Sequence, residues 1–206
     1  VAYENPFRFI QIYIDLETTG LPLKRNEPYT NLENWPYVVQ AALIIEDADH
    51  GILAKRDIIV RPENYTIPES SSNIHGISTQ YALENGEERK DVFGFLDLVL
   101  SKSQSIVGHN LEFDLNVLKA EIIRTKGLDN VLFDKVKPHL ADTMVRGKYI
   151  MYNLKYPKLD ELYYMLFNKH FDNTVVDFKN LSYLRNNTNI VQIFRFWIFK
   201  FKIHLR

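Results

Sequence analysis

The sequence contains no cysteine among its 206 residues. A disulfide framework and thiolate metal sites are therefore both excluded. An excess of positive charge is also missing, because 25 Lys and Arg residues are balanced by 26 Asp and Glu residues, for a net charge of −1. A strongly basic balance that would by itself indicate a nucleic-acid partner is absent, although a local basic surface is compatible with this total.

Long hydrophobic runs are missing as well. No apolar stretch is long enough to cross a membrane, and no signal peptide precedes the first expected strand. We therefore expect a cytoplasmic protein without a membrane span. With 46% hydrophobic residues, the chain can bury one substantial core, so we expect one main domain over residues 1–185 and a basic, aromatic tail over residues 186–206.

The stretch FIQIYIDLETTGL, residues 9–21, alternates as a β-strand does. Side chains two apart on a strand share a face, so the aliphatic residues lie on one face and Asp15 and Glu17 on the other. Two carboxylates on an apolar strand are costly unless a positive group holds them, and Mg²⁺ prefers carboxylate oxygens. The alternative is that both carboxylates face water at the strand end. Gly20 then allows close backbone approach by a ligand.

Hydrophobic patterning along the rest of the chain predicts an α/β fold with a mixed central sheet flanked by helices. A short turn between strands at residues 37–46 and 52–60 implies that the first three strands run antiparallel. Loops are expected over residues 23–36 and 62–72. Apolar spacing predicts a short strand at residues 104–107 and helices at residues 79–85, 91–100, 112–125 and 158–167 and from about residue 174.

Two later segments carry further acidic residues in helices. GHNLEFDLNVL, residues 108–118, places Asp114 in the first turn of a helix that follows a short strand, from where it can point back across the sheet edge. A plain interaction of Asp114 with the helix dipole is the alternative. TVVDFKNLSYL, residues 174–184, places Asp177 in an amphipathic helix, where a position on the solvated face is the alternative.

In this order the three segments resemble the DEDD superfamily of 3′–5′ exonucleases. The likeness is greatest to the branch of the proofreading epsilon subunit of bacterial DNA polymerase III, and it covers roughly residues 7–184. IDLETTGLP is similar to the first motif of that branch, GHNLEFD to its second, and NIHGIS, residues 73–78, to its HGI loop. NWPYVVQ and YPKLDELYYMLF are also similar to members of this group.

The resemblance implies a ribonuclease H-like fold and hydrolysis of nucleic acid, DNA or RNA, from its 3′ end with two Mg²⁺ or Mn²⁺ ions. Such ions, about 3.5–4 Å apart, activate the attacking water and stabilise the leaving oxygen. The implied partners are single-stranded or 3′-ended nucleic acid and, for the epsilon branch, a DNA polymerase subunit. The implied catalytic and metal-binding residues are Asp15, Glu17, Asp114 and Asp177, and the implied substrate-binding residues are Thr18, Thr19, Leu21, His75, Gly76, His109 and Asn110. For His109 and Asn110, ordinary loop hydrogen bonds are the alternative.

The general base departs from the family pattern. The epsilon branch has a histidine five positions before the last aspartate, and another branch has a tyrosine four positions before it. Those positions hold Asp172 and Asn173 here, and the nearest histidine is His170. Either a histidine-bearing segment is missing from the sequence, or the protein is a degenerate member, or His170 takes the role. The well-matched flanks favour the first explanation.

The tail and the overall activity each leave alternatives open. Residues 198–206, IFKFKIHLR, alternate apolar and basic residues, which suits binding to nucleic acid or an anionic surface, or an edge strand without such a role. For the whole chain we expect a metal-dependent exonuclease. A catalytically silent nucleic-acid-binding relative is one alternative. A glycosidase built on a carboxylate pair is another, but it does not explain the HNxxFD motif.

Overall fold

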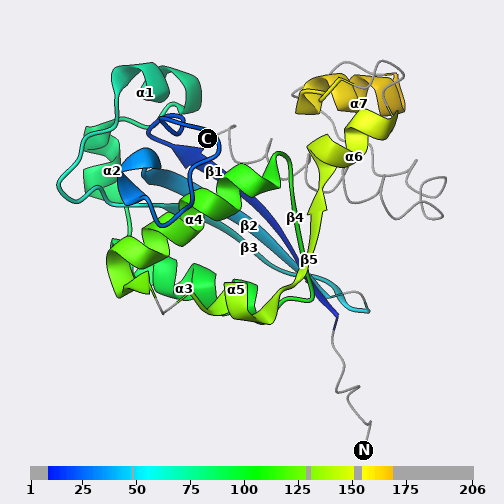
Figure 1. Ribbon diagram of the computed structural model, residues 1–206, viewed down its shortest axis with the longest axis horizontal. Helices are drawn as coiled ribbons and strands as arrows, with labels where there is room; N and C mark the ends of the chain where they lie inside the picture. Colours follow the sequence, from blue (N-terminus) through cyan, green and yellow to red (C-terminus); the bar gives the residue numbers. More distant parts are fainter. Residues whose placement is uncertain (1–8, 48, 129–130, 151–154, 169–206) are drawn as a thin grey trace, which may run out of the picture.

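A computed structural model describes residues 9–47, 49–128, 131–150 and 155–168 of the chain. In this part, five strands form one mixed sheet in the order β3-β2-β1-β4-β5. Figure 1 labels these strands. The antiparallel run of the first three strands is confirmed, and β4 and β5 run parallel to β1. The strands are β1 (Ile10–Thr18), β2 (Val38–Asp47), β3 (Gly51–Ile59), β4 (Ser105–Gly108) and β5 (His139–Asp142).

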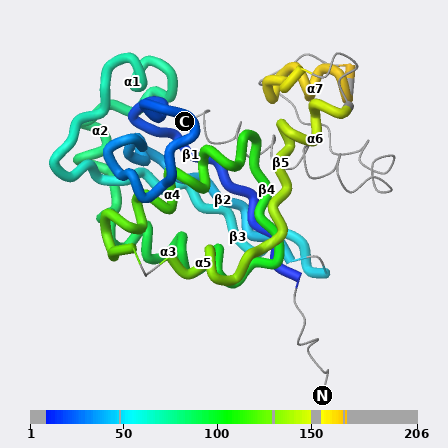
Figure 2. Tube along the Cα trace, viewed as in Figure 1, coloured from blue at the N-terminus to red at the C-terminus, as the bar shows by residue number. Residues whose placement is uncertain are grey.

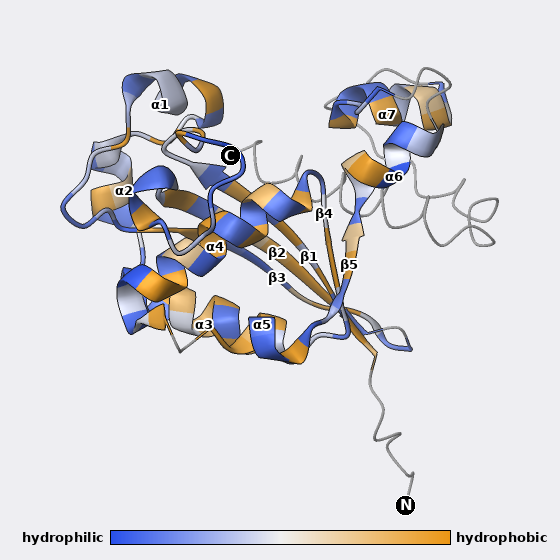
Figure 3. Ribbon diagram, viewed as in Figure 1, coloured by the Kyte–Doolittle hydropathy of each residue, from blue (hydrophilic) through white to orange (hydrophobic). Residues whose placement is uncertain are grey.

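One face of the sheet is covered by α3 (Arg89–Ser101), α4 (Leu111–Lys126) and α5 (Leu132–Val136) (Figure 1). The aliphatic row of β1 packs into this layer, as its alternation predicts. Figure 3 shows the central strands behind these helices largely in the hydrophobic colour. Burial of each large aliphatic side chain contributes about 1.5–3 kcal/mol. The shared core includes Ile12, Ile14 and Leu16 with Phe93, Leu96 and Leu118.

The opposite face carries a smaller apolar cluster around Tyr13. Leu159, at the start of α7 (Leu159–Phe167), packs against this cluster, and α6 (Thr143–Ile150) precedes α7 in the chain. Asp15 and Glu17 continue the row of Tyr13 along β1, because side chains alternate between the faces. The two acids therefore belong to the side of the sheet on which α7 begins.

Two short helices, α1 (Glu69–His75) and α2 (Thr79–Asn85), lie at one end of the sheet (Figure 1). They are held by a third cluster, made of Val39, Ile67, Ile77 and Ala82. The expected loop over residues 62–72 is wrong at its end, because α1 begins at Glu69. Its Ser-rich sequence has modest helix propensity, and tertiary packing overrides that preference.

The four helices expected within the described residues are present, with at most small changes at their ends. The short 3-10 helix η1 (Leu32–Asn34) interrupts the expected polar loop. Within the described ranges, no helix is long and apolar enough to cross a membrane. The expected helix from about residue 174 and the tail lie outside the described residues.

Candidate active site

The acidic pair lies near the carboxyl end of β1. Asp15 is 7% exposed and Glu17 is half-buried. Across the antiparallel ladder, Asp15 is opposite Ala42. The ladder shifts register between Glu17 and Thr18, so regular pairing breaks directly after the pair. The prediction that both acids share one face of the first strand is consistent with this strand and its register.

The turn from β4 into α4 passes close to Asp15. A Cβ added to Gly108 would lie 3.3 Å from the carbonyl oxygen of Ile14, the residue just before Asp15, and 2.8 Å from a methyl carbon of Leu111. Only a glycine fits this approach without displacing its neighbours. Asp114 follows in the first turn of α4 and is 3% exposed. The fold therefore brings the β1 acids and the start of α4 to the same edge of the sheet.

The TTG loop, residues 18–20, lies at the end of β1 beside this edge. The Thr18 hydroxyl donates to the carbonyl oxygen of Gly20 at 2.7 Å, and the Ser71 hydroxyl of α1 donates to the carbonyl oxygen of Thr19 at 2.8 Å. Gly20 has φ +155°, and the space where its side chain would lie is open. Leu21 follows and is 81% exposed. The loop thus presents open backbone and an apolar side chain to solvent.

The HGI segment ends α1 next to that loop. Gly76 adopts the left-handed conformation with φ +78°, and its N–H donates to the carbonyl oxygen of Ser72 at 2.7 Å, a common helix ending. Ile77 is buried, and its N–H donates to Nδ1 of His75 at 3.1 Å. Because α1 also bonds Thr19 through Ser71, the structure brings the TTG and HGI segments together.

His109 and Asn110 stand at the turn into α4. The His109 ring nitrogens lie 2.9 Å from the Thr143 hydroxyl and 3.2 Å from the Pro157 carbonyl oxygen. Asn110 is exposed, adopts a left-handed φ of +64° and makes no side-chain cap to α4. His109 thus makes loop hydrogen bonds, and contact of His109 and Asn110 with a ligand stays a prediction.

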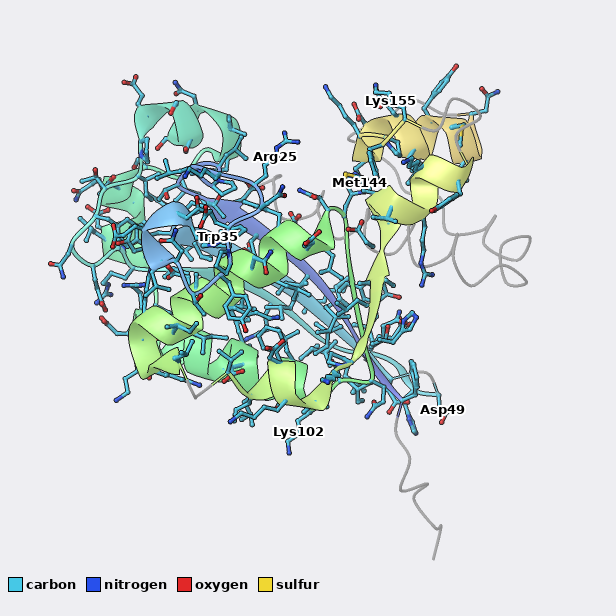
Figure 4. All side chains as sticks on the ribbon, viewed as in Figure 1. Arg25, Trp35, Asp49, Lys102, Met144 and Lys155 are labelled. Atoms are coloured by element: carbon cyan, nitrogen blue, oxygen red, sulfur yellow. The ribbon has the colours of Figure 1, made fainter. Side chains whose placement is uncertain are left out.

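Asp142, the last residue of β5, was not singled out from the sequence. Its carboxylate accepts hydrogen bonds from the N–H groups of Asn110 at 3.1 Å, Leu111 at 2.9 Å and Met144 at 2.8 Å. An Asp-Thr pair after a short apolar segment is a typical helix start and could have indicated this residue. Figure 4 places Met144 at the same end of the molecule as Arg25, opposite Asp49 and Lys102.

A buried ionic network braces the loop from the other side. Arg124 of α4 donates to the carbonyl oxygens of Trp35 at 2.6 Å and Pro36 at 3.2 Å, and it pairs with Glu121. Burial raises the pKa of Glu121, and the guanidinium groups of Arg89 and Arg124 oppose that rise. The last turn of α4 is thereby bound to Trp35 and Pro36, which lead from the loop after β1 into β2.

The donor chemistry of this edge suits a hard divalent cation. Asp15, Glu17 and Asp114 supply carboxylate oxygens, the ligands that Mg²⁺ and Mn²⁺ prefer. Among the residues that the structure describes, no three His, Cys, Asp or Glu side chains form a group that could hold an ion. Asp177 and His170 lie outside the described residues. The convergence of all four acids on two ions stays a prediction.

Solved structures of exonuclease I share this fold. E. coli exonuclease I in complex with a dT13 oligonucleotide aligns with a TM-score of 0.56 at 18% identity, over 68% of this chain and 29% of that one. The complex with dA16 has the same values. Exonuclease I in its apo form aligns with a TM-score of 0.58 at 18% identity, over 76% of this chain and 36% of that one. The expected ribonuclease H-like fold is confirmed, and the chain spans only about a third of the length of these proteins.

The comparisons with protein families identify the chain at the same coarse level. No curated protein matches it, and the likeness to the epsilon branch is not confirmed. The family model for exonucleases named RNase_T matches residues 12–173, a range that includes Asp15, Glu17 and Asp114 and ends before Asp177. This chain therefore belongs to the RNase_T exonuclease family.

Proposed function

We propose that this protein is a metal-dependent 3′–5′ exonuclease that shortens single-stranded or 3′-ended nucleic acid. The observation that carries the proposal is the placement of Asp15 and Glu17 on one face of β1, beside the turn that brings the first turn of α4 and Asp114 to the same edge. Membership of an exonuclease family supports it. Asp177 is the proposed fourth acid, in the segment that follows α7.

In this proposal each part of the edge has a separate task. Two bound Mg²⁺ or Mn²⁺ ions would supply an activated water and a stabilised leaving oxygen. Asp15, Glu17, Asp114 and Asp177 bind those ions, and their mutual repulsion is relieved when they do. The TTG loop and the HGI segment hold the terminal nucleotide, where the exposed side chain of Leu21 offers an apolar surface to a base.

The finer assignments follow from the same proposal. The exonuclease domain occupies residues 1–185, and the basic, aromatic residues 186–206 follow it as a tail. We place the protein in the cytoplasm, where it acts either as a proofreading subunit of a DNA polymerase or as a stand-alone enzyme. The oligonucleotides in the exonuclease I complexes make single-stranded DNA the first substrate to test.

A labelled oligonucleotide tests the proposal. A single-stranded DNA with a fluorophore on its 3′ nucleotide is incubated with the protein and Mn²⁺ or Mg²⁺. Release of the labelled nucleotide that stops with EDTA and with Asp15→Ala is the expected result. Release that survives both EDTA and Asp15→Ala would overturn the metal mechanism. If the wild-type protein releases no labelled nucleotide with either Mn²⁺ or Mg²⁺, the enzyme assignment is overturned.

A silent nucleic-acid-binding relative is the second candidate. Asp172 and Asn173 stand where family members carry the general base, and this favours it. Such a protein would retain the oligonucleotide in a filter-binding assay and leave its length unchanged in Mn²⁺. Binding together with shortening would exclude this candidate.

A further inference from the structure

The carboxylate of Asp142 is the meeting point of two helix starts. Its Oδ1 accepts from the N–H of Asn110 at 3.1 Å and Oδ2 from that of Leu111 at 2.9 Å, at the start of α4. Oδ1 also accepts from the N–H of Met144 at 2.8 Å and Val145 at 3.3 Å, in the first turn of α6. Four backbone donors of two helices therefore share one side chain.

These donors depend on Asp142 for a physical reason. The first N–H groups of an α-helix have no partner within the helix, and a carboxylate there also interacts favourably with the helix dipole. The expected local cap of α4 is missing, because Asn110 makes no side-chain cap bond. The first turn of α4 is thus capped across the sheet edge by a residue 32 positions away from Asn110.

Neighbouring contacts tie the same two turns together. The Thr143 hydroxyl donates to the carbonyl oxygen of Gly108 at 3.1 Å, and it also lies 2.9 Å from Nδ1 of His109. The other ring nitrogen of His109 lies 3.2 Å from the carbonyl oxygen of Pro157, two residues before α7. Figure 2 shows the β4–α4 turn next to the passage from β5 into α6. The start of α4 is therefore joined to the helices that lead toward Asp177.

We propose that Asp142 is a positioning residue of the exonuclease site. Its carboxylate holds the first turn of α4, which carries Asp114, in a fixed relation to α6 and so to the chain that continues through α7. Both oxygens are engaged by backbone donors, so Asp142 acts through the placement of Asp114. The inference rests on the proposed function. It assigns a role to a residue that lies in none of the sequence motifs.

Asp142→Asn weakens the contact that joins the starts of α4 and α6, and it changes the size of the side chain little. The amide nitrogen of asparagine cannot accept a hydrogen bond, so one oxygen must serve donors that two oxygens served before. We expect kcat and Mn²⁺ affinity to fall by about 10–100-fold, as for other residues that orient metal ligands. KM for the oligonucleotide is expected to change little, because the TTG and HGI segments are untouched.

Asp97 provides a matched control on α3. It is fully buried and accepts from the N–H groups of Leu132 at 2.8 Å and Phe133 at 3.2 Å, so it caps α5 as Asp142 caps α4. It also pairs with Lys126 at 3.2 Å, at the opposite end of α4 from Asp114. Asp97→Asn should lower the melting temperature and leave kcat and Mn²⁺ affinity unchanged. A purely structural role for Asp142 would make the two variants behave alike, and that result would overturn the proposal.

Hydrogen exchange provides a readout that needs no activity. In Asp142→Asn the amides of Asn110, Leu111 and Met144 should exchange faster than in wild type, and in Asp97→Asn they should not. If the wild-type protein neither cleaves DNA nor binds Mn²⁺, the proposed function fails and exchange alone decides. Unchanged exchange at Asn110 and Leu111 would then overturn the positioning of α4, and faster exchange would support it.

Discussion

Thr19 and Tyr37 bond each other in both directions at the end of the β1–β2 pair. The N–H of Thr19 donates to the carbonyl oxygen of Tyr37 at 2.9 Å, and the N–H of Tyr37 donates to the Thr19 hydroxyl at 3.0 Å. The threonine side chain thus replaces a backbone acceptor where regular pairing has ended. These two bonds fix Thr19 of the TTG loop to the start of β2, and the Ser71 hydroxyl of α1 bonds the same residue.

Thr19→Val tests that anchor. The substitution keeps the shape of the side chain and removes the hydroxyl, so the N–H of Tyr37 loses its acceptor. We expect the free energy of unfolding to fall by about 0.5–1.5 kcal/mol, the net contribution of a typical hydrogen bond, because this bond is only part-buried. KM for the oligonucleotide is expected to rise. Urea unfolding and steady-state kinetics measure both. Thr19→Ser, which keeps the hydroxyl, is the control, and equal behaviour of the two variants would contradict the anchor.

Neutralising one β1 acid should separate function from stability. Asp15→Asn and Glu17→Gln each remove one of the two negative charges that β1 carries on one face, so the melting temperature is expected to stay or rise without metal. Calorimetric titration with Mn²⁺ is expected to show binding in the wild type and none in either variant. A large fall in melting temperature with metal binding intact would assign these acids to the structure instead.

The fold followed from sequence wherever a pattern was long enough to have a period. The alternation of β1 correctly assigned Ile12 and Ile14 to the core face and Asp15 to the other. β5 has only four residues and α5 only five, and no pattern indicated them. β4 is as short as β5, but its apolar residues stand directly before the GHN segment, and it was predicted. The double cap at Asp142 joins residues more than thirty positions apart, and such contacts exist only after folding.

Arg124→Leu should be among the most destabilising substitutions in α4. It removes one of the two guanidinium groups that neutralise Glu121, which is fully buried. It also removes the donor that bonds the carbonyl oxygens of Trp35 and Pro36, just after η1. Breaking a buried ion pair from one side costs about 3–5 kcal/mol. Thermal and denaturant unfolding measure the loss, and the double variant Arg124→Leu/Glu121→Leu should recover part of it. Additive losses would contradict the network.

The stability that Arg124→Leu loses relative to wild type should depend on pH. Burial raises the pKa of Glu121, and with Arg124 gone less charge opposes that rise. A carboxyl with a raised folded pKa favours the folded state when protonated, so the folded state loses stability as pH rises above the unfolded value of about 4.3. The deficit of Arg124→Leu relative to wild type should therefore grow between pH 4 and neutral pH, and a constant deficit would contradict this account.

The general base can be tested by gain of function. Asp172→His places an imidazole five positions before Asp177, where the epsilon branch has one. A positioned base contributes about 10²–10⁴-fold in rate, so kcat should rise in a chain of this sequence. A protein that carries the missing histidine-bearing segment already has its base and should show no such gain. Asn173→His is the control and should not raise it. Loss of activity in His170→Ala, with no gain in Asp172→His, would assign the role to His170.

The most direct test follows a single-stranded DNA labelled at its 5′ end over time in Mn²⁺. A 3′–5′ exonuclease leaves the label on the remaining strand, so we predict a ladder of products that shorten progressively. The ladder should be absent with EDTA, Asp15→Asn or Asp114→Asn. Immediate appearance of the labelled mononucleotide, or a ladder that persists in both variants, would contradict the account.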